Sequence, residues 1–116
     1  MKKIYHLGTC STNQRILNEI KPAASVLLQD IKLDPITEEE LDAMKELAGT
    51  YEALFSKVAR KYRALGLHEM QLSETDYRRY ILQDYTFLKR PVIIAGKNIY
   101  IGNAASVIAK AKVALG

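Results

Sequence analysis

The residue of this chain best suited to carry chemistry is Cys10, its only cysteine. It stands in the polar segment Gly8–Asn13, between an apolar run typical of a strand and an apolar periodicity typical of a helix. The thiolate is the nucleophilic form of cysteine, and unpaired backbone N–H groups and the dipole at the start of a helix favour that form. A lone cysteine is more often a small buried hydrophobe, but this polar setting favours a nucleophile.

The residues that follow Cys10 are suited to begin a helix and to face an anion. Ser11, Thr12 and Asn13 are all of types that are frequent at helix starts. The backbone N–H groups of a first helical turn also suit an oxyanion. Asn13 can donate its side-chain amide to the sulfur, although a plain helix-entry role is the simpler interpretation.

The composition is that of an ordinary small globular domain. The chain has 116 residues, of which 48% are hydrophobic and 26% are charged. A single cysteine excludes an internal disulfide and fits a reducing compartment, so we expect a cytoplasmic protein. No stretch approaches the roughly 18 apolar residues of a membrane span. We expect no metal site either, because His6 and His68 have no neighbours in a ligand pattern.

A mild positive charge bears on the partners of the protein. The formal net charge is +4 and the pI is about 9.2. The densest cations, at 60–63 and 78–79, lie in helix-like segments, where lysine and arginine usually form a solvated face. A small anionic ligand explains this balance as well as nucleic acid does, and we do not expect a nucleic-acid surface.

The first third of the chain predicts a strand, a helix and a second strand. Lys3–Leu7 is the first strand, and residues 9–21 form a loop and then a helix that ends before Pro22. The run Val26–Leu28 predicts that the second strand, over residues 24–31, is covered on both faces. This order fits a parallel crossover unit.

The middle of the chain, residues 36–86, is predicted to be wholly helical. Thr37 with Glu40, and Ser73 with Asp76, have the spacing of capping boxes. Between them, seven apolar and aromatic residues share a helical stripe that Gly66 ends. The stripe consists of Tyr51, Leu54, Phe55, Val58, Ala59, Tyr62 and Leu65.

The last part returns to strands and predicts one mixed sheet. Pro91–Ala95 and Ile99–Ile101 flank a turn at Gly96–Asn98, as in a hairpin, and Asn103 is placed to cap a final helix. The outer thirds must share a sheet, because neither buries its apolar face alone. We therefore predict an α/β fold. We expect one domain over residues 1–116. Its core consists of residues 1–34 and 87–116, and residues 35–86 form a helical insertion.

Several local sequences, taken in order, resemble one family along the whole chain. Gly8–Arg15 resembles the active-site loop of the glutaredoxin-fold arsenate reductases (ArsC) and their Spx-type relatives. Phe87–Ile94 resembles the second signature of that family, Arg-Pro before an apolar strand. Ala64–Leu67 matches a turn in the family's helical insertion, and Ile101–Asn103 falls where its last helix begins. The resemblance implies a thioredoxin-like βαβ…ββα sheet with a helical insertion.

The resemblance also implies roles for residues from both ends of the chain. Cys10 is then the catalytic thiol, Arg90 lines the same pocket, and Pro91 is cis and faces the thiol. Ser11, Thr12 and Asn13 are then the residues that support the thiolate or bind substrate, together with Pro91.

The chain departs from the family pattern at three positions. Asn13 stands where Spx-type relatives have a second cysteine, so no CxxC pair can form. Glu52 stands at the position of one arginine that arsenate reductases use, and Asn103 or Gly102 stands at the position of another. Of the three family arginines only Arg90 carries over, so arsenate is one candidate substrate among small oxyanions and thiol compounds.

Three functions remain open from the sequence. The first is a thiol-dependent oxidoreductase that binds no cofactor and whose single cysteine is regenerated by glutathione or a glutaredoxin. The second is an Spx-like regulator that binds RNA polymerase, without the cysteine pair that forms the redox switch. The third is a family member that binds a thiol compound without turnover.

Overall fold

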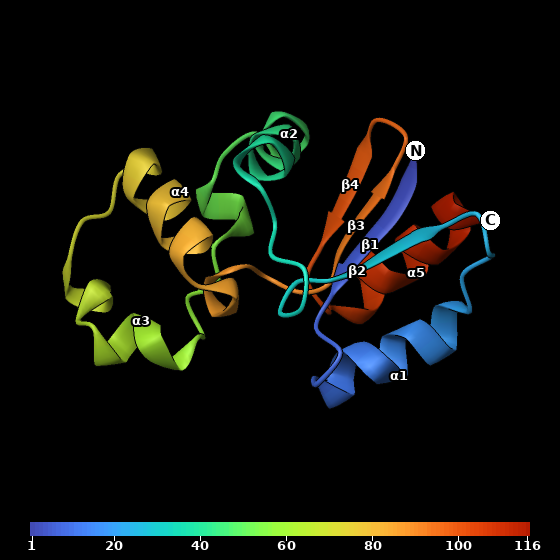
Figure 1. The fold of residues 1–116 in the computed structure, drawn as a ribbon, viewed down its shortest axis with the longest axis horizontal. Helices are drawn as coiled ribbons and strands as arrows, with labels where there is room; N and C mark the ends of the chain where they lie inside the picture. Colours follow the sequence, from blue (N-terminus) through green and yellow to red (C-terminus); the bar gives the residue numbers. More distant parts are fainter. The chain divides into compact units, whose positions relative to one another are not determined.

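A four-stranded sheet joins the two ends of the chain. The computed structural model describes residues 1–116. The strands are β1 (Lys2–His6), β2 (Leu27–Asp30), β3 (Val92–Ala95) and β4 (Asn98–Ile101). They follow the order β2-β1-β3-β4 (Figure 1), with β1 parallel to β2 and antiparallel to β3, and β3 antiparallel to β4. This confirms the prediction that the outer thirds share one sheet.

Contacts divide the chain into two units. The first, here called the sheet unit, consists of residues 1–35 and 90–116, and the second, the helical unit, consists of residues 36–89. The predicted single-domain organisation stays a prediction. The longest helices have 11 residues, and none of the helices has the length and apolar character needed to cross a membrane.

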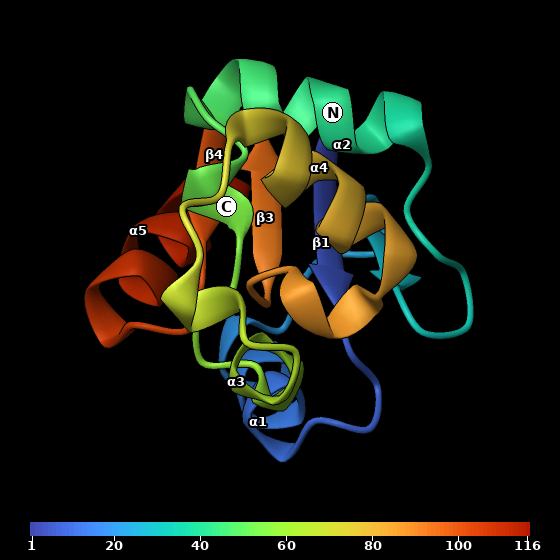
Figure 2. The ribbon, with the colours of Figure 1, turned by 90° about the vertical axis from the view of Figure 1, so that its left-hand side faces the viewer.

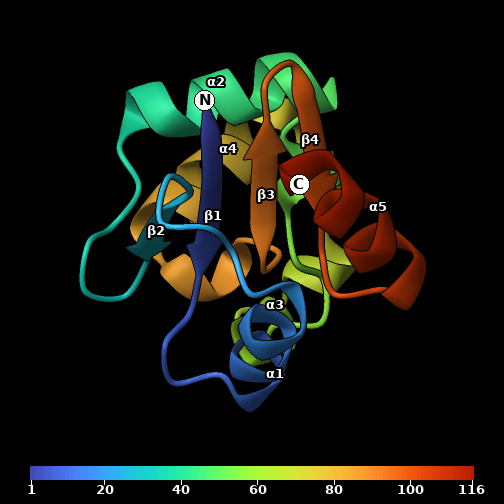
Figure 3. The same ribbon diagram turned by 90° about the vertical axis from the view of Figure 1, so that its right-hand side faces the viewer.

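Two helices cover one face of the sheet within the sheet unit. α1 (Ser11–Ile20) and α5 (Ala105–Leu115) contact each other and lie on the same side of the strands (Figure 3). Their apolar residues recur at helical spacing, so each helix turns one stripe toward the strands. The core between helices and sheet consists of Ile4, Ile16, Ile20, Val26, Ile93, Ala95, Ile108, Ala111 and Leu115.

The helical unit is built from three helices and three short 3₁₀ turns (Figure 2). Its elements are α2 (Glu38–Ala48), η1 (Glu52–Leu54), α3 (Arg60–Ala64), η2 (Leu67–Glu69), α4 (Glu74–Gln83) and η3 (Tyr85–Phe87). Both predicted capping boxes are confirmed, at the start of α2 and at the start of α4. Phe55 forms the centre of the unit, because its ring stacks on Phe87 at 5.2 Å and contacts Tyr77 at 4.9 Å.

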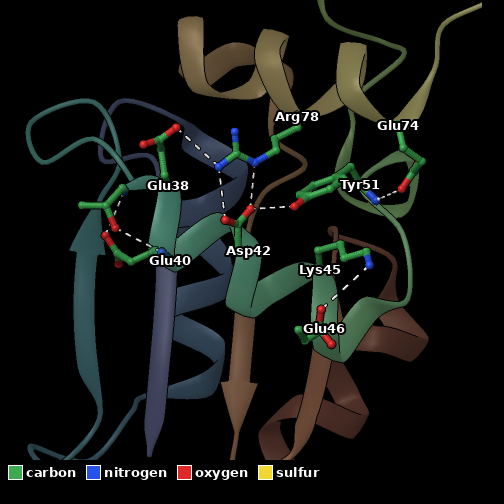
Figure 4. A network of polar contacts seen from close by, with 9 residues as sticks. Glu38, Glu40, Asp42, Lys45, Glu46, Tyr51, Glu74 and Arg78 are labelled. Atoms are coloured by element: carbon green, nitrogen blue, oxygen red, sulfur yellow. Dashed lines mark hydrogen bonds and ion pairs between the residues drawn. The ribbon is translucent and has the colours of Figure 1, made fainter.

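A polar network joins α2 to α4 (Figure 4). Arg78 donates from Nε to Asp42 Oδ1 at 2.8 Å and from Nη2 to Asp42 Oδ2 at 3.1 Å. The hydroxyl of Tyr51 donates to the same carboxylate at 2.6 Å. The hydrogen bonds from Arg78 and then Tyr51 lower the pKa of Asp42 from 3.8 to about 2. This carboxylate is therefore the anchor that two segments of the helical unit share.

The predicted helical stripe through residues 51–65 is wrong. Phe55 lies in an extended bridge with Leu88, where the N–H of Ser56 donates to the carbonyl of Phe87 at 2.7 Å. Burial of the Phe55 ring and pairing with the distant 87–89 segment override the local periodicity. Within residues 51–65 only α3 is α-helical, next to the short 3₁₀ turn η1, and Val58, which the stripe placed inside, is 94% exposed.

Two further predictions at the sheet unit are wrong. The second strand is not covered on both faces: β2 lies at the edge of the sheet, and Leu27 and Leu28 are 53% and 52% exposed. Asn103 does not cap the final helix, because α5 begins two residues later with Ala104 at its N-cap and no side-chain cap bond. The N–H of Gly102 donates to the carbonyl of Pro91. The pairing of β3 with β4 therefore continues to Gly102, and the helix starts only after it.

Candidate active site at one end of the sheet

The strand register brings four chain segments to one end of the sheet. His6 at the end of β1 lies opposite Asp30 at the end of the parallel strand β2. Tyr5 pairs with Val92 at the start of β3, and Val92 pairs with Ile101 at the end of β4. The carboxyl ends of β1 and β2 and the start of β3 therefore lie side by side (Figure 3).

This end of the sheet holds every residue that the sequence predicted for the site. Cys10 lies between β1 and α1, and Ser11, Thr12 and Asn13 form the first turn of α1. Arg90 and Pro91 lie directly before β3. Segments far apart in the sequence thus lie at the same end of the sheet, while the roles of these residues in catalysis stay predictions.

Cys10 is itself the N-cap of α1. Its backbone is extended, with φ −89° and ψ 116°, its N–H donates to the carbonyl of Leu7 at 3.0 Å, and its carbonyl accepts from Gln14 at 3.0 Å. The thiol makes no capping hydrogen bond and is partly exposed. Serine, threonine, aspartate and asparagine are the usual N-cap residues, so a cysteine here breaks a local rule, as functional residues often do.

The first turn of α1 favours a negative charge beside the thiol. Its N–H groups have no partners within the helix, and the positive end of the helix dipole lies there. No acidic residue stands in this turn. An anion bound near Cys10 would therefore face the free N–H groups of this turn.

Side chains hold the turn that leads from β1 to Cys10. Asn13, which is only 2% exposed, accepts from the N–H of Leu7 through Oδ1 at 2.9 Å. Gln14 donates from Nε2 to the carbonyl of Gly8 at 2.9 Å, and Asp30 accepts from the N–H of Gly8 through Oδ2 at 3.2 Å. The helix-entry interpretation of Asn13 is thus supported, and an amide contact to the sulfur stays a prediction.

The Arg90–Pro91 peptide bond is cis, as the resemblance implies. Pro91 is buried, and its carbonyl accepts from the N–H of Gly102 at 2.9 Å, which ties the start of β3 to the end of β4. Arg90 is partly exposed at the same end of the sheet. Its assignment as the arginine of the family's site stays a prediction.

The two positions where the family pattern has other arginines carry no cation here. Glu52 begins η1 in the helical unit, where Oε2 accepts from Lys57 Nζ at 2.7 Å and from the hydroxyl of Tyr77 at 3.2 Å. The bond from Lys57, followed by that from Tyr77, lowers the pKa of the Glu52 carboxyl. Gly102 has a positive φ of 90°, and Asn103 is exposed. The carboxylate of Glu52 is therefore an ionised partner of Lys57.

Charge is divided unevenly between the two units. The sheet unit has nine lysines and arginines against three acids, Glu19, Asp30 and Asp34, for a formal charge of +6. The helical unit has eight against ten, for a charge of −2. The basic excess of the chain therefore belongs to the unit that carries Cys10, and it attracts anions to that unit.

Sequence reasoning placed Gly8 and Gln14 in the active-site loop without giving either a role, and it missed Asp30 as part of the site. The signal for Asp30 was present, because the carboxyl ends of two parallel strands meet at one end of a sheet. A polar residue that ends the second strand of a parallel pair therefore lies beside the loop that follows the first. The pairing with Gly8 in particular needed the three-dimensional arrangement.

Comparison with known proteins gives the chain a family. The model of the ArsC family matches residues 5–111. A curated arsenate reductase of Yersinia enterocolitica is 25% identical over 93 residues, which are 78% of this chain and 66% of that protein. The chain thus spans slightly less than two thirds of that relative.

Solved structures show the same fold. An arsenate reductase from Vibrio cholerae superposes with a TM-score of 0.78 at 18% identity. The matched region covers 94% of this chain and 95% of the Vibrio chain. A protein from Brucella melitensis that is described as related to arsenate reductase superposes with a TM-score of 0.70 at 19% identity. The matched region covers 90% of this chain and 88% of the Brucella chain. These likenesses confirm the predicted thioredoxin-like α/β fold. The Spx-like and non-catalytic alternatives stay predictions.

Proposed function

The chain belongs to the ArsC family, and on that premise we propose that it is a thiol-dependent oxidoreductase that reduces an oxyanion such as arsenate. The observation that carries the proposal is the place of Cys10. The thiol is partly exposed at the N-terminus of α1, without a capping bond, in a unit with a charge of +6. A nucleophilic thiolate and an anionic substrate both fit this position.

The first chemical step is attack of the Cys10 thiolate on arsenic(V). A sulfur–arsenic bond forms, and one arsenic–oxygen bond breaks as its oxygen takes up protons and leaves as water. The N–H groups of Ser11 and Thr12 and the guanidinium of Arg90 are the groups proposed to hold the remaining oxygens. Arsenic is still in its oxidised state after this step.

The second step needs a thiol from outside the chain, because Cys10 is the only cysteine. An external thiolate attacks the sulfur of Cys10, and the electron pair of the sulfur–arsenic bond moves to arsenic, which leaves as arsenic(III). Cys10 is left in a mixed disulfide. A second thiol then releases Cys10 and forms an external disulfide, so two thiols supply the two electrons. Glutathione or a glutaredoxin is the proposed reductant.

The test is arsenate reduction with glutathione, with and without a glutaredoxin, by the purified protein. Cys10→Ser is expected to abolish reduction and to prevent glutathione from attaching to the protein in mass spectrometry. Asn18→Ser, an exposed change eight residues further along α1, is the matched control and is expected to retain both. Reduction that survives in Cys10→Ser, or an unmodified Cys10 after treatment with peroxide and glutathione, would overturn the proposal.

A further inference from the structure

We propose that Asp30 is a positioning residue, which sets the turn that presents Cys10 by holding the backbone of Gly8. The use of the thiol rests on the proposed function, but the contact between Asp30 and Gly8 does not. Asp30 ends β2, opposite His6 in the register. It lies on a different element from Cys10 and acts on the thiol only through the chain between them.

The carboxylate of Asp30 accepts two backbone hydrogen bonds at once. Oδ2 accepts from the N–H of Gly8 at 3.2 Å, and Oδ1 accepts from the N–H of Lys32 at 3.0 Å. Both oxygens are therefore engaged as acceptors. Only a carboxylate offers two acceptor oxygens, because asparagine would turn an NH₂ group toward one of the two N–H groups.

Gly8 is the residue that lets this contact form. A Cβ added to Gly8 would lie 2.3 Å from Asp30 Oδ2 and 3.4 Å from its Cγ. A Cβ essentially never approaches a non-bonded atom closer than 3.0 Å, so the carboxylate of Asp30 would have to move away. The hydrogen bond in its present geometry therefore depends on the absence of a Cβ at position 8, and Gly8 and Asp30 form a matched pair.

The pair acts on Cys10 through a short turn. Cys10 donates its N–H to the carbonyl of Leu7 at 3.0 Å, so Gly8 is the first inner residue of the turn from Leu7 to Cys10. The carbonyl of Gly8 accepts from Gln14 of α1 at 2.9 Å. Gly8 is thus held from β2 at its N–H and from α1 at its carbonyl. Loss of the β2 side leaves the turn, and the N-cap cysteine at its end, anchored only to α1.

The expected consequence concerns the rate of reaction of the thiol. Catalytic geometry depends on holding the nucleophile in place, so a looser turn lowers the fraction of Cys10 that is correctly placed. We expect Asp30→Ala to slow alkylation of Cys10 by iodoacetamide about twofold to tenfold, the range that corresponds to one lost hydrogen bond. In the arsenate assay kcat falls while KM stays unchanged, because Asp30 touches no substrate.

The decisive experiment is a double-mutant cycle on the alkylation rate, with Gly8→Ala and Asp30→Ala alone and together. Gly8→Ala alone displaces the carboxylate and is expected to slow alkylation as much as Asp30→Ala does. In the double variant the added methyl has no carboxylate to meet, so the loss is no larger than in either single variant. Losses that multiply independently would overturn the proposal, as would an unchanged rate in Asp30→Ala.

Two controls separate positioning from charge and from unfolding. Asp34→Asn removes the same charge from the sheet unit at an exposed loop position and is expected to leave alkylation unchanged. An equal loss in Asp34→Asn would show an effect of charge alone and overturn the proposal. Asp30→Ser replaces Asp30→Ala in the cycle if the alanine variant does not fold. Alkylation needs no oxyanion, so a protein without arsenate reduction would still test the pair.

Discussion

Replacement of Asn13 by alanine tests how firmly the start of α1 is attached to the sheet. Asn13 is 2% exposed, and its Oδ1 accepts from the buried N–H of Leu7. Alanine leaves that N–H without a partner, which costs about 1–3 kcal/mol. Alanine is also the better helix former by up to about 0.7 kcal/mol. The net loss of unfolding free energy is therefore roughly 0.5–2.5 kcal/mol.

The assay is thermal and urea unfolding followed by circular dichroism. For a chain of this length 1 kcal/mol corresponds to roughly 4 °C, so we expect the melting temperature to fall by about 2–10 °C in Asn13→Ala. The slope of the urea transition should stay unchanged. Gln14→Ala is the matched control, because it removes a neighbouring but exposed bond to Gly8 that water can replace. We expect Gln14→Ala to change the free energy by no more than about 0.5 kcal/mol.

The comparison of Asn13→Ala with Gln14→Ala decides whether the buried bond to Leu7 holds the turn. Asn13→Asp keeps an acceptor oxygen in the first helical turn, where a negative charge is favoured, and is expected to recover most of the loss at neutral pH. If Asn13→Ala proves no less stable than Gln14→Ala, the buried bond to Leu7 does not hold the turn, and the account of the site in terms of side-chain anchors fails.

Three further predictions concern redox chemistry, pH and charge. Asn13→Cys places a second thiol three residues after Cys10, so we expect peroxide to form an internal disulfide, with less glutathione attached in mass spectrometry than in the parent protein. The pKa of Asp42 is lowered from 3.8 to about 2, so its contribution to stability is present above pH 3.8 and is lost as the pH falls through about 2. The urea midpoint should therefore fall more steeply between these values in the parent than in Asp42→Asn; parallel curves would contradict this. Because the sheet unit has a charge of +6, alkylation of Cys10 by iodoacetate should lose more rate with added salt than alkylation by neutral iodoacetamide. Equal salt dependence would refute steering of anions.

Features set by neighbouring residues could be predicted from the sequence. Both capping boxes depend on residues three apart, and the structure has both of them. The hairpin between β3 and β4 was also predictable from neighbouring residues. Gly96 supplies the positive φ of 62° that its tight turn needs. The position of Cys10 at the start of α1 followed from a local change of periodicity.

Features set by distant residues could not be predicted. Phe55 fits a helical stripe, but its ring is buried against Phe87, and this contact depends on a segment about thirty residues away. Asp30 could be placed at the same end of the sheet as the loop after β1, but its bond to Gly8 itself depends on the three-dimensional arrangement of the two strands. The exposure of Leu28 follows from the place of β2 at the sheet edge, which the order of strands along the chain does not reveal.

The order of strands in the sheet has a consequence for synthesis of the protein. β1 is made before the other three strands, yet it lies between β2 and β3, and β3 is made only after the whole helical unit. β1 can pair with β2 on the nascent chain, whereas its other edge stays open until residues 92–95 emerge. Throughout that interval the nascent chain carries Cys10 without Arg90 and Pro91. Until then the growing polypeptide has an open strand edge, and such an edge is a template on which a strand of another chain can pair.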